Sequence, residues 1–516
     1  MTDPEREVEI VRGTGAVIVV QPEARERGRG ADGADRGAEP PAPEPADESR
    51  HAVTHHVVTI GEQAVAYTAR TGTVTLRTEE GKPRARVFFV AYTRDDVGDL
   101  AERPITFAFN GGPGSSSVWL HLGLLGPRRV ALGTPEDLAP PPWSAVPNPH
   151  ALLDATDLVF IDPVSTGFSR AAEGVKPEGF HAVGEDVRSV AEFIRLYVTR
   201  HARWASPKFL AGESYGTTRA AALAGRLQDA FGMYLNGLVL ISCVLDFQTL
   251  LFHDGNDLPY VLFLPTYAAA AHYHGRVRGD IAALVAEAEA FALGPYASAL
   301  LRGRDLPAEE RATVRATLAR LTGLSEASLD HCDLRPRIHR FCKSLRRDEH
   351  LTIGRLDARF TGIDPDAAGD VPAYDPSYAA ILGPYSTAFN HLVRSELRFE
   401  SDLPYEILTA RVQPWSYDDN ANRFLNVAPT LRDALARNPA LRVFVASGLY
   451  DLATPHLAVQ HTLAHLGPVP RLENRIVLRR YPAGHMMYID EPSLAALKRD
   501  LAAFVAEPAA GPALAG

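Results

Sequence analysis

The chain has 516 residues, of which 53 are basic and 63 are acidic, so its formal net charge is −10. It is 46% hydrophobic and 22% charged, which is typical of globular proteins and excludes a wholly disordered chain. The acidic excess argues against a nucleic-acid-binding protein, because polyanions attract basic surfaces.

The N-terminal region predicts a tail without an export signal. It begins with alternating acidic residues, and its early apolar run, 16–20, is too short for a signal peptide. Residues 22–50 are rich in Pro, Gly and Ala and lack aromatics, so we expect residues 1–53 to be a flexible tail. The longest apolar stretch, 258–271, contains two prolines and is shorter than the roughly 20 residues of a membrane span. We therefore expect a cytoplasmic protein that does not bind membranes.

The rest of the chain predicts an α/β fold in three parts. Short β-type runs at 56–60, 64–76 and 84–92 indicate an antiparallel edge. Brief apolar strands then alternate with helical patterns, which is typical of a mostly parallel sheet covered by helices on both faces. The expected strands are 105–109, 157–161, 208–211, 237–242, 442–446 and 475–480; the expected helices are 183–199, 217–230, 457–466 and 492–506. The core is predicted over 54–246 and 440–516, with a large, mainly helical cap inserted at 247–439.

A nucleophile motif follows one of these strands. Gly-Glu-Ser-Tyr-Gly, residues 212–216, lies between the strand 208–211 and a helix. In that context the motif predicts a tight turn that lifts the hydroxyl of Ser214 above the carboxyl edge of the sheet. The helix N-terminus also offers N–H groups and a positive dipole end to a developing oxyanion.

A base and an orienting acid follow in the expected chain order. Asp451 lies just beyond the strand 442–446, and His485 lies just beyond the strand 475–480. The separation fits one strand–helix–strand step, so we predict a Ser214–Asp451–His485 triad. The pair His461 and His465 has a spacing suited to a metal, but the glutamate of H-E-x-x-H is absent and a solvated helix face is the simpler interpretation. No metal or organic cofactor is expected.

A glycine-rich loop follows the strand 105–109. It runs Asn-Gly-Gly-Pro-Gly over 110–114, and no Gly-Lys-Ser/Thr follows to make it a phosphate loop. Glycines let the backbone approach a substrate carbonyl closely. We predict that the N–H groups of Gly112 and Tyr215 form the oxyanion hole.

These segments resemble the serine carboxypeptidase family, peptidase family S10, of the α/β-hydrolase superfamily. The resemblance covers about 105–490 and rests on the segments 110–114, 157–169, 212–215, 447–451 and 484–486. It implies that Asn110 and Glu213 bind the terminal carboxylate of a peptide. Two carboxyl groups hydrogen-bond only if one is protonated, and burial raises a glutamate's pKa, so activity toward peptides is expected to peak below neutrality.

Several positions depart from the family pattern. Ala108 and Leu124 stand where the family has a tryptophan and a glutamate of its carboxylate network, and Ser115 replaces a common cysteine. With three cysteines in all, the chain looks like a divergent, bacterial-type branch. Cys332 and Cys342 are the better candidates for a bridge, although three free thiols are the simpler expectation. The departures leave the triad intact and affect the carboxylate site.

The sequence supports one function and two alternatives. The first is a serine-type carboxypeptidase that releases C-terminal amino acids through an acyl-enzyme. The second is an esterase, amidase or acyltransferase with the same triad, acting on a small acyl substrate. The third is a noncatalytic binding protein on a hydrolase scaffold. The oligomeric state stays open: 231–235 and 258–273 are apolar enough for a homodimer interface, but an ordinary core explains them equally well.

Overall fold

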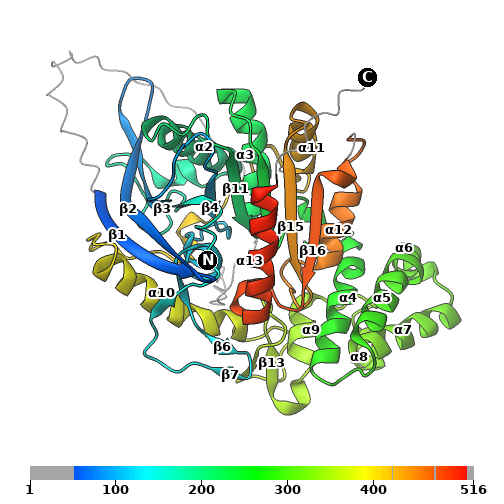
Figure 1. The fold of residues 1–516 in the computed structure, drawn as a ribbon. Helices are drawn as coiled ribbons and strands as arrows, with labels where there is room; N and C mark the ends of the chain where they lie inside the picture. The colour runs from blue at the N-terminus through cyan, green and yellow to red at the C-terminus, as the bar shows by residue number, and fades with distance from the viewer. Residues whose placement is uncertain (1–50, 421, 470–471, 508–516) are drawn as a thin grey trace, which may run out of the picture.

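The fold is that of an α/β-hydrolase, built on one large, mostly parallel sheet. The computed structural model describes residues 51–420, 422–469 and 472–507. The strand order is β1-β2-β3-β9-β4-β11-β12-β15-β16, and the strands from β9 to β16 are parallel (Figure 1). Their bounds are β9 (Asp157–Ile161), β4 (Ile105–Phe109), β11 (Lys208–Glu213), β12 (Gly237–Ile241), β15 (Arg442–Gly448) and β16 (Ile476–Tyr481).

Three antiparallel strands form one edge of the sheet, as predicted. They are β1 (His51–Ile60), β2 (Gln63–Arg77) and β3 (Pro83–Arg94), each longer than the sequence pattern indicated. The prediction of a tail over 1–53 was wrong at its end, because residues 51–53 pair with β2. Residues 1–50 of that predicted tail lie outside the described residues.

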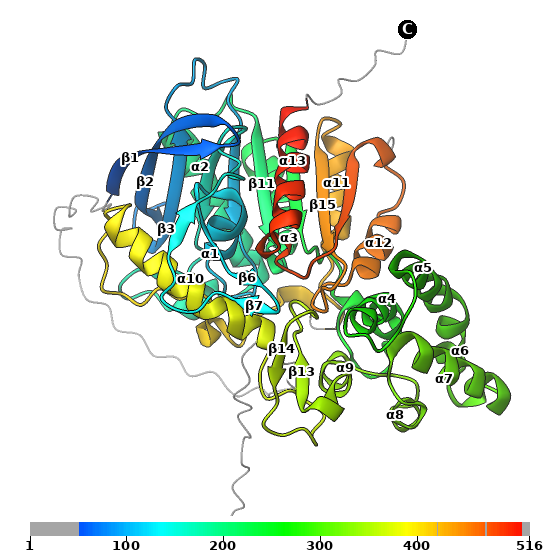
Figure 2. The ribbon, with the colours of Figure 1, turned by 60° about the horizontal axis from the view of Figure 1, so that its bottom comes forward.

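Helices cover both faces of the sheet, because the strand residues point alternately into two apolar layers. One layer packs against α2 (Val183–Arg200), α3 (Tyr215–Phe231) and α11 (Ala428–Arg437). The other packs against α10 (Pro376–Ser395) and α13 (Glu491–Ala506). Figure 2 shows α10 crossing below the antiparallel edge and α13 lying along the parallel strands.

The predicted cap region divides into two parts. The helices α4 (Leu258–Tyr273), α5 (Ile281–Phe291), α6 (Ala297–Arg302), α7 (Ala308–Thr322), α8 (Glu326–His331) and α9 (Ile338–Ser344) surround a third apolar core. The segment from α10 to α11 packs instead on the two layers of the sheet. The apolar run 258–273 is largely buried in the helical part. All three cysteines are free thiols.

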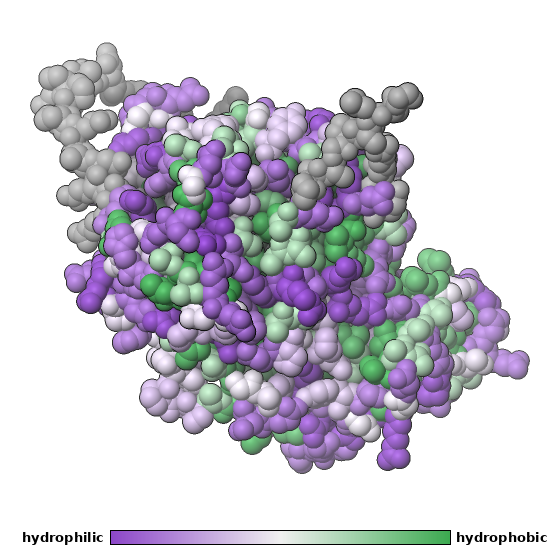
Figure 3. Space-filling model, viewed as in Figure 1, coloured by the Kyte–Doolittle hydropathy of each residue, from purple (hydrophilic) through white to green (hydrophobic). Residues whose placement is uncertain are grey.

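The surface of the helical part carries exposed apolar side chains. Figure 3 shows green, apolar residues gathered over the cap helices, where Leu293 and Leu301 are exposed. The helical run Ile281–Asp305 is long and apolar enough to cross a membrane by length and composition alone, and 39% of the tested window is buried inside the structure.

The insertion leaves the core and returns to it at neighbouring points. The N–H of Phe247 donates to the Leu425 carbonyl at 2.9 Å, and the N–H of Val427 donates to the Leu245 carbonyl at 2.8 Å. The two chain crossings are thus paired antiparallel beside the end of β12. The insertion therefore begins and ends at one place beside the sheet.

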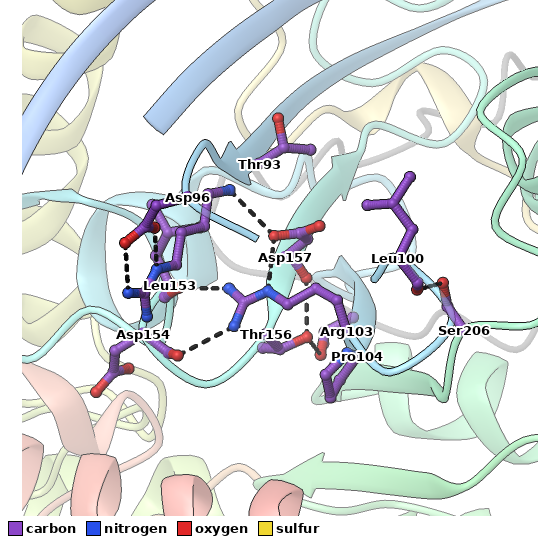
Figure 4. A network of polar contacts seen from close by, with 12 residues as sticks. Thr93, Asp96, Leu100, Arg103, Pro104, Leu153, Asp154, Thr156, Asp157 and Ser206 are labelled. Carbon is purple, nitrogen blue, oxygen red and sulfur yellow. Dashed lines mark hydrogen bonds and ion pairs between the residues drawn. The ribbon is translucent and has the colours of Figure 1, made fainter. Parts of the chain in front are cut away.

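A buried charge network fastens the opposite, amino edge of the sheet (Figure 4). Asp157, the first residue of β9, accepts from Arg103 at 3.1 Å and from Arg203 at 2.6 Å, and all three side chains are buried. Arg203 also donates to the carbonyl of Arg103 at 2.8 Å. Because every charge is paired and hydrogen-bonded, this network holds the strand starts in register. It lies at the edge opposite the carboxyl ends of the parallel strands.

Candidate active site

The loops that carry the predicted site residues meet at the carboxyl edge of the parallel strands. Asn110 follows β4, Ser214 follows β11, Asp451 follows β15 and His485 follows β16. One cavity is lined by the segment 110–112, by Glu213, Ser214 and Tyr215, and by His485. The carboxyl edge is where open α/β sheets place their ligands. The structure therefore brings together residues that lie up to 375 positions apart in the sequence.

Ser214 occupies a strained turn at the start of α3. Its φ of 59° lies in the left-handed region, which is unfavourable for a side chain and typical of a nucleophile elbow. A Cβ at Gly212 would lie 2.2 Å from the Gly216 carbonyl oxygen, so only glycine fits there. The Ser214 N–H donates to the Ile241 carbonyl at 3.0 Å, which fixes the turn against β12.

His485 and Asp451 form a buried pair. The ring Nδ1 of His485 donates to Asp451 Oδ2 at 2.8 Å. Asp451 also accepts from the Ala453 and Thr454 N–H groups at 2.8 and 2.9 Å and from the Thr454 hydroxyl at 2.7 Å. These contacts fix the carboxylate, which in turn fixes the ring so that Nε2 is the free nitrogen.

The pKa values of this pair shift in opposite directions. Burial opposes ionisation of Asp451, but the His485 charge and hydrogen bonds from His485 and Thr454 outweigh it and lower the pKa. Burial likewise opposes protonation of His485, but the charge and hydrogen bond of Asp451 and the charge of Glu213 raise its pKa above the ordinary value. The arrangement favours an imidazolium beside a carboxylate, the state that a general base reaches after taking a proton.

The glycine-rich loop packs directly on the serine turn. A Cβ at Gly111 would lie 2.4 Å from the Tyr215 nitrogen and 2.8 Å from the Glu213 carbonyl oxygen. Gly112 has a φ of 103°, which a side chain would disfavour. The first N–H groups of a helix have no intrahelical partner, and Tyr215 is the first residue of α3. Gly112 and Tyr215 line the same cavity as Ser214, and their role as an oxyanion hole stays a prediction.

Arg219 braces this loop from behind. It donates to Asp186 at 2.8 Å and to the Asn110 carbonyl at 2.6 Å, and it is fully buried. This salt bridge is structural, because Arg219 is not part of the cavity lining. Its contact with Asn110 ties α3 and α2 to the start of the loop.

Glu213 is a buried carboxyl group beside the nucleophile. Burial raises its pKa to about 7, while the His485 charge and hydrogen bonds from Tyr488 and Asn110 act in the lowering direction. The Tyr488 hydroxyl donates to Glu213 Oε2 at 2.6 Å. Asn110 uses Oδ1 to accept from the Leu120 N–H at 3.0 Å, which leaves its amide N–H₂ group on the Glu213 side. A glutamate with this pKa carries a proton over part of the physiological pH range.

Two departures from the family pattern lie close by and are apolar. Ala108 is buried in β4, and Leu124 is buried in the π-helical turn His121–Leu125. Neither side chain offers a hydrogen bond to a carboxylate. Asn110, Glu213 and Tyr488 are polar groups that remain on this side of the site.

Sequence reasoning missed the contribution of the cap to the base. The His485 N–H donates to the Leu356 carbonyl at 2.7 Å. The carboxylate of Asp357 accepts from the Gly484 N–H and is paired with Arg359, whose guanidinium is 2.7 Å away. These residues lie in no motif, and only the adjacency of two segments 129 positions apart in sequence, 356 and 485, reveals them.

Comparisons with known proteins match part of the chain to a known family. The serine carboxypeptidase family model matches residues 61–250, which include the glycine-rich loop and Ser214. Carboxypeptidase Y from Candida albicans is 29% identical over 141 residues, which are 27% of this chain and 23% of that protein. The match thus spans about a quarter of that relative's length.

A solved structure shares the fold. Kex1(delta)p, a prohormone-processing carboxypeptidase from Saccharomyces cerevisiae, superposes with a TM-score of 0.53 at 16% identity, over 85% of this chain and 91% of that one. A proline iminopeptidase from Mycobacterium smegmatis gives a TM-score of 0.34 at 13% identity, over 84% and 97% of the two chains. Residues 61–250 are thus similar to the serine carboxypeptidase family, peptidase family S10, which supports an assignment to that family, and the chain has the α/β-hydrolase fold.

Proposed function

We propose that the protein is a serine-type carboxypeptidase that removes C-terminal amino acids from peptides. The observation that carries the proposal is the position of Glu213. This buried carboxyl group, with a pKa raised to about 7, adjoins the serine of a cavity that also contains His485. A protonated carboxyl group there can donate a hydrogen bond to a substrate's terminal carboxylate.

The mechanism follows from the buried pair and the two loops. His485 Nε2 takes the proton of Ser214 as the serine oxygen attacks the last peptide carbonyl. The N–H groups of Gly112 and Tyr215 stabilise the oxyanion, and Asp451 stabilises the imidazolium. The C–N bond then breaks, His485 gives its proton to the leaving amine, and the acyl group stays on Ser214. Water activated by His485 hydrolyses this ester and restores the serine.

Recognition of the chain end restricts the reaction to the last bond. Asn110 and the protonated Glu213 would bind the terminal carboxylate, while Tyr488 holds Glu213 Oε2. Glu213 and Ser214 line the same cavity, so a carboxylate bound by Glu213 would lie close to the carbonyl that Ser214 attacks. An amide in place of the carboxylate loses the charge and leaves the Glu213 proton poorly paired.

A peptide digest read by mass spectrometry tests the proposal. We expect stepwise loss of C-terminal residues, and a large preference for a blocked peptide with a free carboxylate over its amide. The Ser214→Ala variant should show neither cleavage nor labelling by a fluorophosphonate. Internal cleavage, or labelling that persists in the variant, would contradict the proposal.

A second candidate is an esterase, amidase or acyltransferase that uses the same triad. The apolar side chains of Ala108 and Leu124 favour it, because they remove two polar positions from the carboxylate side of the site. Such an enzyme would hydrolyse small esters and would treat a free acid and its amide alike. The peptide pair above therefore separates the two candidates. A noncatalytic binding protein would not react with the fluorophosphonate.

A further inference from the structure

Arg355 brings a permanent positive charge to the catalytic cavity. It lies in the cap, directly before Leu356, whose carbonyl accepts from His485. It lines the cavity together with Ser214 and His485 and is partly exposed. Among the described residues that line this cavity, it is the only lysine or arginine. An arginine stays charged at any pH at which the protein is folded.

The backbone of Arg355 is fixed while its side chain is left available. Its N–H donates to Asp375 Oδ1 at 3.2 Å, and its carbonyl accepts from the Leu452 N–H at 3.1 Å, next to Asp451. In the part of the chain that the structure describes, the guanidinium forms no ion pair and donates no hydrogen bond. The group is therefore held at the cavity without a salt bridge to any carboxylate of the described residues, Asp375 in the same lining included.

The nearby carboxylates have other partners. Asp375 is the N-cap of α10, and it accepts from the Ser377 N–H at 3.0 Å and from the Ser377 hydroxyl at 2.5 Å. Glu213 accepts from Tyr488 and has a pKa near 7, so it is only partly charged. Asp451 is bound to His485 and Thr454. None of the three forms a salt bridge with Arg355 among the described residues.

A cation in this position calls for an anionic ligand. Desolvation by a bound substrate penalises an unpaired charge, whereas a carboxylate matches the planar guanidinium with two parallel hydrogen bonds. The charge of Arg355 also reaches the reaction centre, since it acts to lower the pKa of His485. An anion on Arg355 would therefore lie within electrostatic range of the proposed base.

We propose that Arg355 binds a carboxylate of the substrate and makes the cavity selective for anionic substrates. The proposal deepens the proposed function and rests on it, because it takes the bound substrate to be a peptide that the enzyme cleaves. The carboxylate belongs either to an acidic side chain or to the peptide's terminus. Both sources present the same group to the guanidinium, and matched substrates tell them apart.

The test uses three pairs of blocked dipeptides that differ in one carboxylate. The pairs are Phe-Glu against Phe-Gln, Glu-Phe against Gln-Phe, and Phe-Leu against Phe-Leu amide. We expect the acid-to-amide ratio of kcat/KM to fall about tenfold or more in Arg355→Gln for at least one pair, mainly through KM. The affected pair identifies the carboxylate. Arg355→Lys should keep part of the preference, because it keeps the charge but loses the planar fork.

Arg304→Gln is the matched control, because Arg304 is an exposed cap arginine that does not line the cavity. It should leave all three ratios unchanged. Unchanged ratios in Arg355→Gln as well would overturn the proposal, provided that fluorophosphonate still labels Ser214 in that variant. If Arg355→Gln fails to fold, the ratios of Arg355→Lys decide, and wild-type ratios there would overturn it.

A labelling experiment separates this proposal from the carboxypeptidase activity itself. If the wild type cleaves none of the dipeptides, the proposed function fails, but Ser214 can still be labelled. N-acetylglutamate should then slow fluorophosphonate labelling more than the diamide N-acetylglutamine amide, which has no carboxylate, does in the wild type, and equally little in Arg355→Gln. Equal protection by the two compounds in the wild type would contradict binding of a carboxylate by Arg355.

Discussion

The N–H of His485 donates to the carbonyl of Leu356 at 2.7 Å, so a cap residue holds the backbone of the proposed base. The neighbouring Ser242 hydroxyl donates to the His485 carbonyl at 2.6 Å, which fixes the same residue from the sheet. His485 is thus fixed between the cap and β12 as well as by Asp451. A change at Asp357, which follows Leu356 and does not line the cavity, is therefore expected to act on catalysis through the position of His485.

The buried pair Asp357–Arg359 supports this contact. Replacing Asp357 with Ala leaves the Arg359 guanidinium without its main buried partner and frees the Gly484 N–H, so we expect a loss of about 3–5 kcal/mol in the free energy of unfolding. Urea unfolding measures it. The exposed pair Arg340–Asp370 is the control, and Asp370→Ala should cost about 1 kcal/mol or less. Equal effects of the two substitutions would show that the buried pair does not brace the loop.

Asp451 orients and stabilises the base, so removing its charge should lower kcat. Asp451→Asn should lower kcat by about 10⁴-fold with little change in KM, because the amide favours the wrong ring tautomer. Thr454→Val, which removes one hydrogen bond to the same carboxylate, should have a much smaller effect. Steady-state kinetics on a peptide and an ester check both variants. A decrease of less than tenfold in Asp451→Asn would remove this residue from its role.

The pH profile should differ between substrates with and without a carboxylate. His485 acts as a base only when neutral, so activity rises with pH through its raised pKa. Glu213 donates only when protonated, so efficiency toward free-acid peptides should fall as pH rises through about 7. These limits give a narrow optimum near neutrality or just below it. Activity toward an ester without a carboxylate should fall only at acidic pH, where His485 is protonated, and should not fall above neutrality.

Two variants test whether Glu213 causes the fall in kcat/KM above neutrality, the alkaline limb of the pH profile. Glu213→Gln cannot ionise, so kcat/KM for free-acid peptides should stay level above neutrality. Tyr488→Phe removes a hydrogen bond that lowers the pKa of Glu213, so the limb should move to higher pH. The measurement is kcat/KM from about pH 5 to about pH 9. The assignment to Glu213 fails if the limb persists unchanged in Glu213→Gln.

The contact between the glycine-rich loop and the serine turn predicts the effect of a single methyl group. In Gly111→Ala, the added Cβ would lie 2.4 Å from the Tyr215 nitrogen, so the loop must move away from the oxyanion site. Loss of one donor lowers kcat by about 10²- to 10³-fold, and we expect that range for esters and peptides alike. Gly98→Ala, where nothing lies within 4 Å, should leave kcat unchanged. An active Gly111→Ala enzyme would contradict the predicted geometry.

The sequence predicted the sheet and the loops of the site because their signals are local. Each strand of the core is a short apolar run, and Ser214, Asp451 and His485 each follow such a run directly. The sequence did not show how the cap divides, because helical periodicity is the same whether a helix packs in the cap or on the sheet. The part from α10 to α11 packs on the sheet through contacts that are distant in the chain.

The sequence analysis did not find several site residues, because their roles also depend on contacts that are distant in the chain. Leu356 acts through a backbone carbonyl, which carries no sequence signal. Arg355 and Asp357 acquire their roles only because their segment lies against the loop of His485. Tyr488 had a weak signal, since it follows His485 by three positions, just past the recognised segment 484–486.

The paired crossings at Phe247–Leu425 and Leu245–Val427 have an evolutionary consequence. Because the insertion starts and ends at neighbouring points of the core, its length can change during evolution while the register of the sheet is preserved. One stretch of it, 354–359, is tethered to the histidine loop and is less free to change. The helical part from α4 to α9 can therefore vary among related enzymes, while the stretch 354–359 and the part from α10 to α11, which packs on the sheet, are inherited nearly intact.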